Sequence, residues 1–188
     1  MIEHAALDAF AERGYHGASI DEIARRSGVT PPVVYDHFES KLALHKRLLE
    51  RTRDELLEMW RASLGGEGPA SERIPRALDA WARYIEEHPY APRLFFSETT
   101  GDPEIEAIHR EIRDQGTAVL TAIVGAEGMG DPGDRQSMEM AAELVRAGLG
   151  GLAMWWSEHP DVPREQIVAT AVNTLWIGLE RVRDGESV

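Results

Sequence analysis

Apolar residues recur at spacings of three and four along almost the whole chain, whereas no segment alternates apolar and polar residues for long. The first pattern places apolar side chains on one face of a helix, and a half-buried strand requires the second. We call each run of apolar residues with this spacing a stripe. Glycine or proline bounds each stripe, as expected where helices begin or end. The pattern therefore predicts an all-α fold with about nine helices.

The first two stripes are short. Gly14 follows the first one, at a point where the chain can reverse through a positive φ. Ser19 and Glu22 have the spacing of a capping box, so the hydroxyl and the carboxylate are both expected to satisfy free N–H groups at the start of a second helix. We expect this helix to stop at Gly28.

A third short helix and a long fourth helix follow. Thr30 is expected to cap the third helix, with Pro31 at its first position, where a missing N–H costs nothing. The third helix should end near Phe38, and Ser40 should cap a long helix that ends at Gly65-Gly66. A short helix, a turn with glycine and a second short helix form the plan of a helix-turn-helix, whose second helix enters the major groove of DNA.

Composition limits the class of protein. The chain has 188 residues, 43% of them hydrophobic, and it contains no cysteine. It is long enough for a sizeable core and has neither disulfides nor thiolate metal sites. Its longest nearly apolar run, residues 147–156, is about half of the roughly 20 residues that a membrane-spanning helix needs. We expect a cytoplasmic protein with no membrane contact and no cofactor.

The net charge opposes a simple nucleic-acid-binding interpretation. The chain carries 20 basic and 33 acidic residues, for a net charge of −13, whereas proteins that bind nucleic acid usually present a basic surface. Most of the acidity falls after the first 50 residues. This acidic part of the chain should repel DNA. Non-specific binding should therefore be weak, and two well-placed DNA-binding modules should be needed.

Several short motifs together resemble the DNA-binding domain of the TetR family. They span the first 47 residues and include Phe10-Ala11-Glu12-Arg13-Gly14-Tyr15, Ser19-Ile20-Asp21-Glu22-Ile23-Ala24, Ser27-Gly28-Val29-Thr30, Tyr35-Asp36-His37-Phe38 and Ser40-Lys41. The resemblance implies a helix-turn-helix domain over residues 1–47. It also implies a larger helical domain for ligand binding and dimerisation over residues 48–188.

Two groups of residues are candidates for contact with DNA. Free N–H groups at helix N-termini bind phosphates, which makes Ser19 and Thr30 candidates. By resemblance, Tyr35, His37 and Lys41 contact the DNA backbone.

The first turn of the third helix is left for contacts with bases, and it consists of Thr30, Pro31, Pro32 and Val33. The two prolines stand where related proteins often carry glycine, lysine or other polar residues. Apolar contact with thymine methyl groups and one hydroxyl hydrogen bond are the most that this turn offers. We therefore expect sparse direct readout of sequence.

The last two long stripes contain many small residues, namely Ala141, Ala142, Ala147, Gly148, Gly150, Gly151, Ala169, Ala171 and Gly178. Small residues allow helices to approach closely, and the resemblance implies that these two helices pair with their mates in a homodimer. The alternative is ordinary packing of the same helices within one chain.

A small-molecule pocket is implied for the larger domain. Aromatic residues with a few polar groups suit such a pocket, although they also suit a plain core. The candidate lining residues are Trp60, Trp81, Tyr84, Phe95, Phe96, His109 and Trp155. An aromatic lining favours a hydrophobic or aromatic effector.

The sequence thus predicts a transcription regulator, most simply a repressor that a small-molecule effector releases from its double-stranded DNA operator. Two other functions stay open. Glu106 and His109 have the spacing of a carboxylate-bridged metal helix, which suggests a metal-dependent helical enzyme, but no second motif accompanies them. The acidity and the double proline suggest a small-molecule binding protein with a degenerate DNA-binding module.

Overall fold

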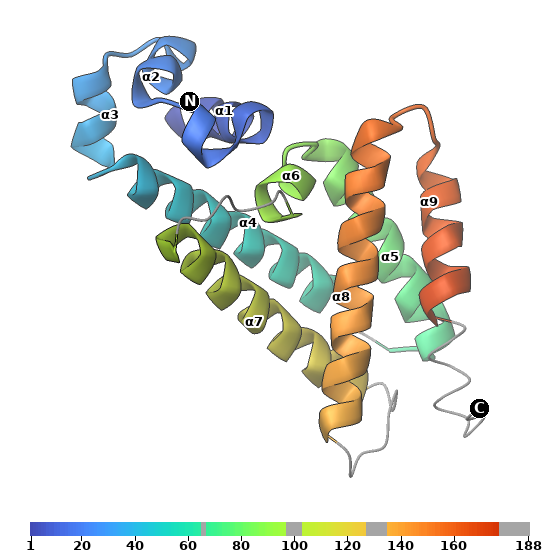
Figure 1. The fold of residues 1–188 in the computed structure, drawn as a ribbon. Coiled ribbons are helices and arrows are strands. Elements are labelled where there is room, and N and C mark those ends of the chain that lie inside the picture. The colour runs from blue at the N-terminus through green and yellow to red at the C-terminus, as the bar shows by residue number, and fades with distance from the viewer. Residues whose placement is uncertain (65–66, 97–102, 127–134, 177–188) are drawn as a thin grey trace. The chain divides into compact units, whose positions relative to one another are not determined.

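The structure, a computed structural model, describes residues 1–64, 67–96, 103–126 and 135–176 (Figure 1). The described residues form nine α-helices and a π-helical turn, which confirms the all-α prediction. None of these helices is both long and apolar enough to cross a membrane. The helices are α1 (Ile2–Gly17), α2 (Ile20–Ser27), α3 (Pro31–His37), α4 (Lys41–Leu64), α5 (Ala70–Glu87), α6 (Ala91–Phe96), α7 (Pro103–Ala126), α8 (Arg135–Glu158) and α9 (Arg164–Ala171), followed by the turn η1 (Val172–Trp176).

The chain divides into two compact units. The first unit comprises residues 1–54 and 90–112, and the second comprises residues 55–89 and the described residues from 113 onward. Two long helices, α4 and α7, run from one unit into the other. The predicted domain boundary after residue 47 stays a prediction.

The first unit is organised around the apolar faces of four helices. α1 packs on α2, and α2 packs on α3. Ile23 of α2, Val34 of α3, and Leu44 and Leu48 of α4 are fully buried. Helices as short as α2 and α3 are unstable alone in water, so this burial stabilises them.

Two glycines shape the first unit as the sequence predicts. Gly14 has a φ of 66° and breaks the regular geometry of α1. Gly28 ends α2 in the left-handed conformation, with a φ of 71°. The N–H of Val29 then donates to the carbonyl of Ala24 at 3.0 Å, which completes a Schellman motif.

The second unit contains α5, α8 and α9, and α9 packs on both of the others. Arg164, next to the cap of α9, donates to Asp79 at 3.1 Å and to Glu86 at 3.0 Å, both on α5. Trp156 of α8 donates through Nε1 to the carbonyl of Val162 at 2.9 Å, which fixes the turn between α8 and α9. A small apolar cluster surrounds the fully buried Ala142 and includes Ala70, Ile74, Leu120, Met138, Ala141 and Val172.

Two histidines lie directly after the last residue of a helix, His88 after α5 and His159 after α8. His88 Nδ1 lies 2.9 Å from the carbonyl oxygen of Tyr84, and His159 Nδ1 lies 2.8 Å from that of Trp155. Each imidazole also stacks on the aromatic ring four residues earlier. Each imidazole thus lies within hydrogen-bond distance of a carbonyl near a helix C-terminus, although the Tyr84 carbonyl also accepts the backbone N–H of His88 at 2.9 Å.

His45 of α4 is a buried polar residue of the first unit. The residue is only 4% exposed, and neither ring nitrogen finds a hydrogen-bond partner among the described residues. The ring lies 4.8 Å from that of Phe10 and 5.1 Å from that of Tyr15, both on α1, and 5.7 Å from that of His109 on α7. Burial, with repulsion from His109 and Lys41, lowers the pKa of His45 to about 3.

Replacing His45 by phenylalanine should make the protein more resistant to acid. Between about pH 6.5 and pH 3 the unfolded chain binds a proton at His45 that the native protein does not bind, so this residue lowers stability as the pH falls. The stability difference between His45→Phe and the wild type should grow below about pH 6.5, by at most about 1.4 kcal/mol per pH unit. Urea unfolding at a fixed protein concentration measures it, and parallel pH curves for the two proteins would refute the assignment.

Candidate nucleic-acid interface

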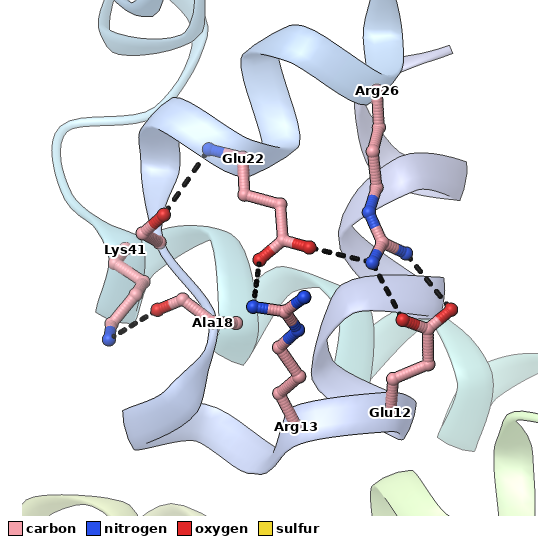
Figure 2. A network of polar contacts seen from close by, with 7 residues as sticks. Glu12, Arg13, Ala18, Glu22, Arg26 and Lys41 are labelled. Carbon is pink, nitrogen blue, oxygen red and sulfur yellow. Dashed lines mark hydrogen bonds and ion pairs between the residues drawn. The ribbon is translucent and has the colours of Figure 1, made fainter.

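The N-terminus of α2 is capped by Ser19. Its Oγ accepts the N–H of Glu22 at 3.2 Å, which confirms one half of the predicted capping box. The other half is wrong, because the carboxylate of Glu22 does not return to the backbone. It accepts a hydrogen bond from Arg26 at 2.6 Å and lies 3.3 Å from Arg13 (Figure 2). The two arginines attract this carboxylate more strongly than a neutral N–H does.

Arg26 joins α2 to α1. Its guanidinium donates two hydrogen bonds to Glu12 of α1, at 3.0 and 2.6 Å, besides the one to Glu22 (Figure 2). The hydrogen bond from Arg26 lowers the pKa of the Glu12 carboxyl. Arg13, Arg26, Glu12 and Glu22 together carry no net charge, so the network cancels two negative charges next to the proposed phosphate-binding helix end.

α3 begins at the predicted place, with Thr30 in the cap position and Pro31 and Pro32 in the first turn. Within the described part of the chain, the Thr30 hydroxyl makes no capping hydrogen bond. Thr30 and Pro32 are exposed, Pro31 and Val33 are half-buried, and the next residue, Val34, faces the core. The first turn therefore presents one hydroxyl and mostly apolar atoms.

The second half of α3 presents the predicted backbone-contacting residues. Tyr35 is 53% exposed, and His37 is exposed as well. Phe38 is half-buried and ends the helix, in keeping with a packing role. Tyr35 and His37 thus lie on the same short helix as the exposed atoms of Thr30 and Pro32.

Lys41 differs from the other candidates because its ammonium faces its own unit. The group donates to the carbonyl of Tyr15 at 2.9 Å. It also donates to the carbonyl of Ala18 at 3.0 Å (Figure 2). It also lies 4.4 Å from the centre of the Tyr15 ring. Burial lowers the pKa of this lysine. An ammonium has three donors, and no acceptor among the described residues takes the third.

The candidate lining residues of the effector pocket fall in both units. Phe95 and His109 belong to the first unit, and the side chain of Phe96 lies outside the described residues. In the second unit Trp81 and Tyr84 are buried, Trp60 is half-buried and Trp155 is 45% exposed. The Tyr84 hydroxyl donates to the carboxylate of Glu55 at 2.9 Å. The pocket itself stays a prediction.

α8 shows two different faces. Ala142, Gly150 and Ala153 are buried within the second unit. Another face exposes large apolar side chains and glycine, namely Met140, Leu144, Gly148, Gly151 and Trp155. Only part of the small-residue stripe therefore serves packing within the chain. Gly178, predicted in the same interface, lies outside the described residues.

Comparison with known proteins identifies the family. Residues 2–48 match the family model described as bacterial regulatory proteins, tetR family. Over 179 residues the chain is 30% identical to the HTH-type transcriptional activator FasR of Mycolicibacterium smegmatis (strain ATCC 700084 / mc(2)155), which covers 95% of this chain and 81% of that relative. This chain belongs to the tetR family. It is a DNA-binding transcriptional regulator of the helix-turn-helix type and not an enzyme.

Two further regulators are similar to this chain, one in sequence and one in fold. The HTH-type transcriptional repressor BepR of Brucella suis biovar 1 (strain 1330) is 27% identical over 161 residues, or 81% of this chain and 77% of the relative. The structure of the regulator FadR from Bacillus subtilis in complex with stearoyl-CoA superposes with a TM-score of 0.76. That match is 18% identical and covers 98% of this chain and 97% of FadR, so it supports the fold alone.

Sequence reasoning missed the ion-pair network of α1 and α2. Glu22 and Arg26 are four residues apart on one helix, which is a recognisable signal for a pair on a helix surface. The contact of Arg26 with Glu12 joins residues that are 14 positions apart, and no local pattern contains it. The inward orientation of Lys41 is likewise a contact between distant segments.

Proposed function

We propose that this regulator binds a double-stranded DNA operator as a homodimer and that a small-molecule effector changes its affinity for that operator. The exposed face of α3 supports the proposal most directly. Thr30, Pro32, Tyr35 and His37 are exposed on this helix, while Val34 anchors it in the core. A recognition helix requires this division between a buried side and an exposed side.

The proposed contacts separate into positioning and base reading. The N-terminus of α2 with Ser19, the hydroxyls of Thr30 and Tyr35, the ring of His37 and the third N–H of Lys41 would hold phosphates. Thr30, Pro31, Pro32 and Val33 would contact bases, mainly through thymine methyl groups. The few polar groups in that turn imply that DNA shape contributes to specificity.

The exposed face of α8 supports the homodimer. Leu144 is 70% exposed and Met140 is 56% exposed, and exposed large apolar side chains gathered on one helix are typical of an interaction surface. A two-fold dimer places two recognition helices on successive major grooves, about 34–36 Å apart. This requirement favours a second copy of the chain as the partner.

Control by a hydrophobic effector rests on the aromatic residues of the second unit and on the neighbouring structures. FadR, which has the same fold, holds stearoyl-CoA, and we take this compound as the first probe. We propose release of the operator by the effector, as in a repressor. FasR is named an activator and BepR a repressor, so the sign of control in this chain needs its own measurement.

Replacing Ser19 by aspartate should separate helix capping from DNA binding. Aspartate caps a helix as well as serine does, so Ser19→Asp should keep its stability, whereas Ser19→Ala should lose about 1 kcal/mol. The added carboxylate should nevertheless weaken operator binding more than alanine does, because it faces a phosphate. The operator is first recovered by genome-wide DNA pull-down with the full-length protein, and binding is then followed by fluorescence anisotropy.

The matched control is Ser71→Asp, which adds the same charge to the exposed first turn of α5. It should leave operator affinity close to that of the wild type. Equal losses for Ser19→Asp and Ser71→Asp would show that only net charge matters. Failure to recover any DNA would favour the small-molecule binding protein with a degenerate DNA-binding module.

Gly151→Arg should convert the dimer into monomers. A Cβ at Gly151 would meet no atom of the described residues within 4 Å, so the long charged side chain disturbs the exposed face and not the chain itself. Gly148 is a poorer choice because its Cβ would lie 3.2 Å from Leu175 of the same chain. Replacing a helical glycine also favours the helix, so unfolding cannot explain a loss of association.

Sedimentation velocity and operator titration measure this effect. Gly151→Arg should sediment as a helical monomer with reduced operator affinity, whereas Ala62→Arg, at an exposed position of α4, should remain dimeric. A wild-type protein that is monomeric at micromolar concentration would refute the proposed dimer.

Effector and operator should change each other's affinity by the same factor. Thermodynamic linkage demands this equality, and the sign of the change shows whether the effector releases the operator or strengthens its binding. Stearoyl-CoA and other hydrophobic ligands are titrated with and without operator while tryptophan fluorescence is followed. Weaker ligand binding in the presence of operator supports release by the effector. A ligand that binds with the same affinity in both titrations would contradict effector control.

A further inference from the structure

The helix-turn-helix is a segment whose two ends lie close together. α2 and α3 occupy residues 20–37, between Ala18 at the end of α1 and Lys41 at the start of α4. The ammonium of Lys41 donates to the carbonyl of Ala18 at 3.0 Å (Figure 2). This hydrogen bond therefore joins a residue shortly before the segment to a residue shortly after it.

We propose that Lys41 is a positioning residue that holds the two ends of the helix-turn-helix segment together in the protein without DNA. This role rests on the DNA-binding function proposed above and adds to the phosphate contact proposed for the same side chain. Its two inward hydrogen bonds restrict the ends of α2 and α3 before DNA arrives. The recognition helix is thereby preformed.

The groups that accept the hydrogen bonds of Lys41 are suited to a cation. α1 ends in a short turn after the break at Gly14, and the carbonyls of Tyr15 and Ala18 accept the two hydrogen bonds. Carbonyls at a helix C-terminus lack partners within the helix and carry partial negative charge. The ring of Tyr15, 4.4 Å from the nitrogen, adds a cation–π attraction.

α3 packs on few other parts of the first unit. It packs mainly on α2, which in turn packs on α1. Val34 is the buried anchor of this seven-residue helix. A short helix held by one neighbour depends strongly on how the chain at its two ends is restrained. The Lys41 contact supplies such a restraint, because it fixes the end of α1 to the start of α4.

Hydrogen exchange without DNA tests the proposal. Lys41→Met keeps the length of the side chain but removes its charge and its donors. The amides of residues 19–38 should exchange at least about tenfold faster in this variant, because losing even one hydrogen bond from a charged donor has an effect of that order. Peptides from α8 and α9 should exchange as in the wild type. Mass spectrometry of the full-length dimer resolves these segments.

Lys46→Met is the matched control. Lys46 is exposed on the same helix and lies 3.9 Å from Glu50, so this change removes the same charge without touching α1. It should leave the exchange of residues 19–38 unchanged. Wild-type exchange in Lys41→Met would overturn the proposal, and so would faster exchange of α8 and α9 by the same factor, which would mean a general loss of stability. Because no DNA is present, these results do not depend on operator binding.

Discussion

The DNA-binding unit depends on one constraint: α2 and α3 are too short to be stable by themselves. They have eight and seven residues, well below the length at which isolated helices persist in water. Their stability comes from burial of Ile23 and Val34, from the cap at Ser19 and from the left-handed Gly28. The polar residues of α3 can therefore be exposed for DNA without loss of the fold, because none of them supports the core.

Local ion pairs neutralise carboxylates near the proposed DNA-binding helices, in a chain that is acidic overall. In the first unit, Arg13 and Arg26 pair with Glu22, and Arg26 also pairs with Glu12. The exposed pair of Arg26 with Glu12 contributes little to stability. The value of these pairs for DNA binding is that they cancel carboxylates that would otherwise face a polyanion. The same pairs engage Arg13 and Arg26, so these two side chains are not available for phosphates.

The sequence alone was sufficient to predict features that depend on residues close together in the chain. Caps at Ser19 and Ser40, the break at Gly14 and the end of α2 at Gly28 each follow from residue chemistry within a few positions, and the structure has all of them. Contacts between segments far apart in the sequence could not be predicted in this way. Glu22 has capping-box spacing, yet Arg13 on another helix takes part of its carboxylate. His45 lies within an ordinary amphipathic helix, and only the fold shows that its ring is buried against α1 and α7.

The engagement of Arg13 and Arg26 in ion pairs makes dimerisation central to the proposed function. A single module with a mostly apolar reading turn and few phosphate contacts should bind DNA weakly. Linking two modules makes the second contact intramolecular, at an effective concentration in the millimolar range. That gain requires the correct spacing of the two recognition helices, so a small change in spacing removes much of the affinity. A regulator with weak modules is for this reason well suited to control by an effector that alters geometry and leaves the contact residues unchanged.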